Sequence, residues 1–68
     1  MNHQQRDRIA RVTQRAIEAF GDEARARQWM RRLNRAFQGV APVDLLGTDA
    51  GVALVTDELG RVEYGDLY

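Results

Sequence analysis

The sequence predicts an all-α protein, a small bundle of three main helices with a short helical turn and a C-terminal tail. Apolar residues recur at the spacing of one helix face in three separate segments, and capping residues stand at the segment ends. A chain of 68 residues without cysteine is one small domain with no disulfide framework. We therefore expect a single domain over 1–68, with an N-terminal helix at 1–20, a core region at 21–63 and a tail at 64–68.

The first segment predicts a helix over 4–20. Its apolar residues share one face and are Ile9, Val12, Ala16, Ile17 and Phe20. Gly21 is placed to end this helix in the left-handed conformation. Asp22 follows at once and can cap a second helix.

The second segment predicts a helix over 22–37. Its apolar face consists of Ala26, Trp29, Met30, Leu33 and Phe37. Trp29 is expected to be the largest single contributor to the core, because a tryptophan buries more area than the other side chains. Asn34 and Gly39 mark the region in which this helix ends.

A corner at 39–51 separates the second helix from the third. Pro42 suits the first turn of a short helix over 42–46, and Gly47 is expected to end that turn in the left-handed conformation. Thr48 can cap a third helix from about 49 to 60 or slightly beyond, with Val52, Val55, Leu59 and Val62 along one face. The alternative for 52–64 is a β-hairpin, which is less favoured because a lone two-stranded ribbon is marginal in water.

The core predicted from these patterns combines the largest apolar residues of the helices and the corner. Its members are Trp29, Leu33, Phe37, Leu45, Val55 and Leu59. A chain this short buries only about 60% of its unfolded surface, so its core is marginal alone. We therefore expect a homodimer, formed through apolar surface left over on the first or the last helix.

The formal net charge is zero but is unevenly distributed. Residues 1–40 carry nine arginines against four acids, and residues 41–68 carry one arginine against six acids. All ten cations are arginine, so a DNA-binding or dimerisation module that uses the arginine-rich helical face is the alternative function. The competing interpretation is a solvated face with internal ion pairs, such as Arg11 and Arg15 near Asp7 and Glu18.

The side chains that catalysis requires are scarce. The single histidine is His3, and the chain has no cysteine and no serine, so we expect no metal site, no cofactor and no enzymatic activity. No apolar run approaches the roughly 20 residues that span a bilayer, and no signal-peptide pattern opens the chain. We therefore expect a cytoplasmic protein that does not bind membranes.

The residues also resemble a known family over about 16–68. The residues that carry the likeness are Phe20, Gly21, Asp22, Ala26, Trp29, Met30, Leu33, Asn34, Phe37, Gly39, Pro42, Leu45, Leu46, Thr48, Gly51, Val55, Leu59, Gly60, Arg61, Glu63, Tyr64 and Gly65. In this set and its spacing the chain is similar to the toxin-binding domain of the Xre/MbcA/ParS antitoxins. Two positions depart from the family pattern, since Asp66 stands at a commonly apolar position and Ala41 at a common Ser or Thr cap before the proline.

The resemblance implies an all-helical antitoxin domain of a bacterial type II toxin–antitoxin system, whose partner is a RES-domain toxin acting on NAD. The end of the chain would enter the toxin's active site. The toxin-binding positions implied in this way are Arg61, Glu63, Tyr64, Gly65, Asp66, Leu67 and Tyr68. Family members usually carry an N-terminal helix-turn-helix domain, whereas this chain starts with one helix, so we expect weak or absent DNA binding.

Overall fold

The computed structural model describes residues 3–65, which form helices and helical turns linked by short connections. The α-helices are α1 (His3–Phe20), α2 (Glu23–Arg31) and α3 (Asp49–Gly60). Between them lie two 3-10 turns, η1 (Arg35–Phe37) and η2 (Pro42–Leu45), and a π-helical turn, η3 (Arg61–Gly65), follows α3 directly. The all-α class is confirmed, and the alternative hairpin at 52–64 does not form.

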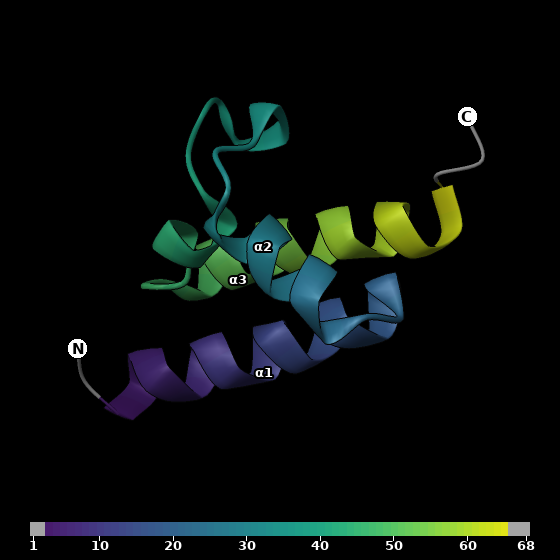
Figure 1. The fold of residues 1–68 in the computed structure, drawn as a ribbon. Helices are drawn as coiled ribbons and strands as arrows, with labels where there is room; N and C mark the ends of the chain where they lie inside the picture. The colour runs from purple at the N-terminus through teal and green to yellow at the C-terminus, as the bar shows by residue number, and fades with distance from the viewer. Residues whose placement is uncertain (1–2, 66–68) are drawn as a thin grey trace.

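The helix α1 packs against both α2 and α3. It runs in the same general direction as α3, while α2 crosses between them in the view of Figure 1. As a result the C-terminal end of α3 and η3 lie at the end of the molecule where α1 turns into α2 (Figure 1). Within residues 3–65, no helix is both long and apolar enough to cross a membrane.

The corner between α1 and α2 forms as the sequence predicts. Gly21 has a φ of 70°, and its N–H donates to the Ile17 carbonyl at 2.8 Å, which closes α1 with a left-handed residue. Asp22 caps α2, because its Oδ1 accepts a hydrogen bond from the Ala24 N–H at 3.2 Å. Two adjacent residues therefore end one helix and start the next.

The helix α2 ends six residues earlier than the predicted 22–37, at Arg31. Asn34 is the reason, because its side chain accepts from the Ala36 N–H at 2.9 Å and its backbone pairs with Val40. Short polar side chains that bond to nearby backbone compete with the helix in this way. Gln38 and Gly39 then turn the chain back with φ values of 57° and 87°. The nine residues 32–40 therefore form an excursion from the bundle, visible above α2 in Figure 1.

The corner between the excursion and α3 is partly as expected. Pro42 opens η2, and Thr48 caps α3 by accepting from the Gly51 N–H at 3.0 Å. The prediction for Gly47 is wrong, since the positive-φ glycines of the described chain are Gly21 and Gly39. Instead η2 ends at Leu46 with φ −86° and ψ 11°, which any residue can adopt.

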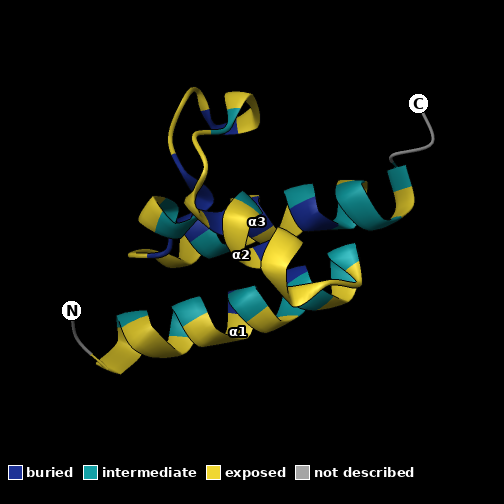
Figure 2. Ribbon diagram, in the orientation of Figure 1, coloured by how far each residue is buried: buried dark blue, intermediate teal, exposed yellow. Residues whose placement is uncertain are grey.

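The core lies where α1, α2, η2 and α3 meet, and Figure 2 shows the buried residues on their facing sides. Its buried members are Val12, Ala16, Ala26, Met30, Phe37, Leu46, Val55 and Leu59. Phe37, Val55 and Leu59 confirm the predicted core, while Trp29 and Leu45 are half-buried and pack against it. Leu33 is a wrong prediction, because its side chain is 75% exposed once α2 ends before it.

Trp29 joins the three parts of the chain that meet on this side of the core. Its ring lies 5.8 Å from the ring of Phe20 at the end of α1 and 6.3 Å from the ring of Phe37 in η1. Both geometries are tilted or edge-on, which aromatic pairs prefer. Phe37 thus anchors the excursion to the bundle.

Candidate functional site

The candidate site is η3, the last described turn of the chain, which follows α3 directly. The Arg61 N–H reaches the carbonyls of both Asp57 and Glu58, so the helical backbone continues from α3 without a break. From Arg61 to Gly65 the turn widens to π geometry. Single π-helical turns are rare and are found frequently at functional sites.

The structure places four of the seven predicted toxin-binding residues. Arg61 is exposed and donates from Nη1 to Glu58 Oε1 at 3.0 Å, while Glu63 is half-buried. Tyr64 is 71% exposed, and Gly65 follows it at the last described position. The other three, Asp66, Leu67 and Tyr68, lie outside the described residues.

Glu63 is held by a residue of α1 that the sequence did not single out for the site. Its Oε1 lies 2.6 Å from Nη2 of Arg15, and Arg15 Nη1 is also 4.0 Å from Glu18 Oε1. The contact with the Glu63 side chain raises the pKa of Arg15 above its ordinary value. Oε1 is nevertheless buried without a well-aligned hydrogen bond, so the contact is a close ion pair rather than a directed one. The sequence predicted only the Arg15–Glu18 half of this arrangement.

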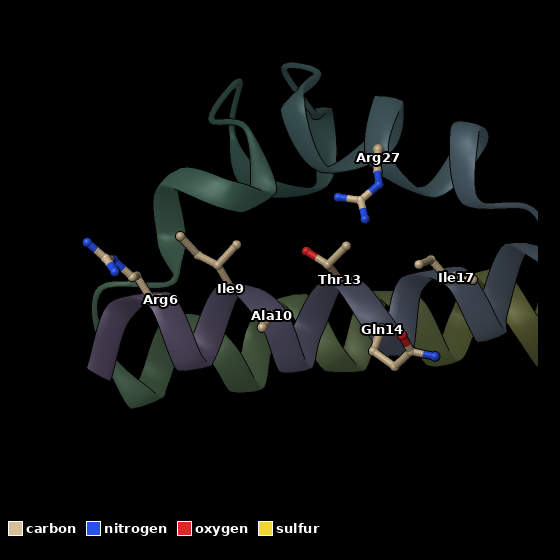
Figure 3. A pocket seen from close by; sticks show the side chains of 7 residues that line it. All are labelled: Arg6, Ile9, Ala10, Thr13, Gln14, Ile17 and Arg27. Carbon is tan, nitrogen blue, oxygen red and sulfur yellow. The ribbon is translucent and has the colours of Figure 1, made fainter. Parts of the chain in front are cut away.

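A groove between α1 and α2 forms a second surface feature, on the side of α1 drawn in Figure 3. It has a volume of about 410 Å³, and Ile9, Ala10, Thr13, Gln14 and Ile17 of α1 line it. Arg6 stands at one end, and Arg27 of α2 reaches over it from the opposite wall (Figure 3). The lining is mixed, since Ile9, Ala10 and Ile17 are apolar while Arg27 lies opposite Thr13 midway along the groove (Figure 3).

Neither feature offers the groups of a catalytic centre. Residues 3–65 contain no cluster of three His, Asp or Glu side chains that could hold a metal ion. The groove holds one hydroxyl, that of Thr13, and its other polar residues are Gln14, Arg6 and Arg27, so no general base lies beside that hydroxyl. The arrangement can bind a partner but has no evident means of activating one.

Six arginines in the described chain have no carboxylate partner within ion-pair distance. They are Arg6, Arg11, Arg25, Arg31, Arg32 and Arg35, and all are exposed. The expected pair of Arg11 with Asp7 is absent from the ion pairs of residues 3–65, whereas Arg8 pairs with Asp49 at 2.9 Å. The front half of the chain therefore presents a largely unneutralised basic surface.

The fold and the site together define a small helical protein-binding module with an exposed aromatic residue in its last described turn. The chain belongs to the Xre/MbcA/ParS antitoxin family, because residues 15–65 match the family's C-terminal toxin-binding domain. It is 39% identical over 59 residues to a protein of Photorhabdus laumondii subsp. laumondii named "Antitoxin Xre". The aligned region is 85% of this chain and 40% of that relative, so the chain spans less than half of its relative's length. None of the solved structures matches the chain.

Proposed function

We propose that this chain neutralises a RES-domain toxin that acts on NAD, and that residues 61–68 enter the toxin's active site. The observation that carries the proposal is Tyr64, a large side chain 71% exposed in the last turn of a toxin-binding domain. Exposed tyrosines of this kind are common anchors at protein interfaces. Gly65, which has no side chain, allows the chain beyond it to approach a narrow pocket closely.

The chemistry of the last residues fits such a pocket. A site that binds a dinucleotide presents cationic groups or N–H donors to the diphosphate. Asp66 directly follows η3 in the sequence and brings a carboxylate that those groups would accept, while Tyr64 and Tyr68 fill apolar or aromatic subsites. The tail would thus occupy the NAD site as a mimic of the dinucleotide, and no catalytic group of this chain takes part.

Deletion of Tyr64–Tyr68 tests the mechanism when the shortened chain and the toxin are expressed together. Binding should persist through the helical surface, but protection of the cells should be lost. The matched control is Leu33→Ala, which changes an equally exposed apolar residue in the excursion and should protect fully. Full protection by the shortened chain would show that tail insertion is wrong. A neighbouring gene that encodes a RES-domain toxin would support the choice of partner independently.

Self-association is a further part of the proposal. The groove on α1 leaves Ile9 and Ile17 only half-buried, and a second copy would cover them in a cytoplasmic homodimer. Sedimentation at micromolar concentration should give twice the 7.7 kDa of the chain, and Ile9→Arg should return it to monomer. A wild-type chain that sediments as a monomer would contradict this part.

DNA binding is the second candidate function, and the six unpaired arginines are the observation that favours it. They would contact phosphates without reading base sequence, so the affinity should be weak and should fall steeply with salt. We expect little binding to a 20-base-pair duplex, about the length of one operator, at physiological salt. Tight binding under those conditions, lost in Arg31→Gln with Arg32→Gln, would favour this function over toxin neutralisation.

A further inference from the structure

The ion pair between Arg15 and Glu63 differs from the others in the described chain because both its side chains are less than one-third exposed. Arg15 is 30% exposed and Glu63 is 27% exposed, whereas each of the other four pairs has a member that is at least 59% exposed. Ion pairs shielded from water are screened less by salt than surface pairs. It also connects α1 to η3, two elements at opposite ends of the sequence.

Apart from this contact, little side-chain packing holds η3 in place. None of its residues is buried, and Val62 is its one half-buried large apolar side chain. Its other ion pair, between Arg61 and Glu58, is made along the same helix and cannot orient the turn against α1. The backbone of η3 continues from α3, and the ion pair of Glu63 with Arg15 is what ties this turn to α1.

Fixing Glu63 also restricts the direction of Tyr64. Successive side chains of a helix project about 100° apart, so holding Glu63 against α1 limits the directions in which Tyr64 can project. With Glu63 held against α1, Tyr64 is turned outward, in agreement with its 71% exposure. Arg15 and Gly65 are also the first and last residues of the region that matches the toxin-binding domain.

We propose that Arg15 is a positioning residue for toxin binding: through Glu63 it sets the direction in which Tyr64 and the residues after it are presented to the toxin. The inference rests on the proposed function of the tail and adds to it a residue of α1, which does not itself touch the toxin's pocket. Without Arg15, the Glu63 carboxylate has no partner in its partly buried position and turns to water, since an unpaired charge is costly to keep there. The tail then samples many directions, and ordering it on binding lowers the affinity.

A double-mutant cycle tests the proposal, with the toxin encoded by the adjacent gene as the probe and titration calorimetry as the measurement. Arg15→Gln is made both in the full chain and in a chain that lacks Tyr64–Tyr68. In the full chain it should weaken binding by about tenfold, whereas in the shortened chain it should have no effect, because no tail remains to be oriented. Arg15→Lys should recover most of the affinity. Arg11→Gln is the matched control, one helical turn away on α1 and exposed, and should change neither chain.

A second measurement needs no toxin. In the free full chain, Arg15→Gln should speed hydrogen exchange of the amides of residues 61–65 and leave those of α2 unchanged. Unchanged exchange at 61–65 would overturn the proposal.

The outcomes separate this inference from the proposed function. An Arg15→Gln effect of equal size in both chains would mean that Arg15 only stabilises the fold, and it would overturn the inference. Unchanged binding of the full chain would overturn it as well. The proposed function is tested separately, in chains that keep Arg15. It fails if a chain that lacks Tyr64–Tyr68 still neutralises the toxin.

Discussion

Gly51→Ala should destabilise the protein, although alanine is the better helix former. Gly51 lies buried in the first turn of α3, directly against the backbone of Leu45 in η2. A Cβ built on Gly51 would overlap the Leu45 carbonyl oxygen and lie 2.7 Å from its carbonyl carbon. A carbon and a carbonyl oxygen in contact are about 3.3–3.6 Å apart, so the overlap with the Leu45 oxygen would require the two backbones to separate by about 2 Å.

The magnitude follows from two opposing contributions. Overpacking of a filled site costs about 1–3 kcal/mol, and a clash with backbone belongs at the upper end because no side chain can rotate away. In the opposite direction, the higher helix propensity of alanine stabilises the folded state by about 1 kcal/mol relative to glycine. The net loss of unfolding free energy is therefore about 2 kcal/mol, which lowers the melting temperature of a domain this size by about 10 °C.

The same substitution at Gly60 is the control. Gly60 is the last residue of α3, has no positive φ, and a Cβ there would meet no atom within 4 Å. Gly60→Ala should therefore raise the melting temperature by a few degrees, about 4 °C or more if the full propensity is gained. Thermal unfolding followed by far-ultraviolet circular dichroism measures both variants. If Gly51→Ala melts at or above the temperature of the wild type, the close packing of η2 on α3 is wrong.

Three further predictions concern stability. Trp29→Ala should lower the unfolding free energy by about 3 kcal/mol, the lower end of the range for a large aromatic residue, because Trp29 is half-buried. Chemical denaturation should then show a domain near the limit of folding. A loss below about 1 kcal/mol would mean that the two ring contacts of Trp29 are not maintained. Thr48→Ala should cost about 1 kcal/mol through the lost cap of α3, and Thr48→Ser should restore it. Arg8→Ala should cost less than about 1 kcal/mol because Asp49 is 94% exposed, and the loss should shrink further at high salt; a large, salt-independent loss would contradict this account.

The sequence predicted the elements whose ends are encoded locally. The bounds of α1 and α3 fall within a residue of those expected, because periodicity and caps such as Thr48 act over a few residues. The same periodicity misled at α2, where Leu33 and Phe37 fit the helical template. The Asn34 side chain accepts a hydrogen bond from the Ala36 N–H, and the spacing of apolar residues gives no sign of that bond. Leu46, fully buried, was left out of the core because two adjacent leucines give no sign of which one faces inward.

The site was predicted only in part, for a different reason. Arg61, Glu63 and Tyr64 were identified from the family resemblance, and no property of their own spacing predicted a π-helical turn. Arg15 could not have been paired with Glu63 from the sequence, because the contact depends on how α1 lies against the end of α3. Contacts between elements distant in the chain follow from packing, and local patterns carry no record of packing angles.

The excursion at 32–40 makes one stretch of the backbone far more vulnerable to proteases than the bundle. Phe37 is its one buried side chain, and its ends are joined by the bridge between Asn34 and Val40. A segment with so few buried contacts opens at a small fraction of the global unfolding free energy. Arg32 and Arg35 stand exposed within it, and both are sites for trypsin. Limited digestion with trypsin should therefore first cut the chain within this excursion. One fragment would contain α1 and α2 and the other α3 and η3, and the two fragments would still be held together by their shared core.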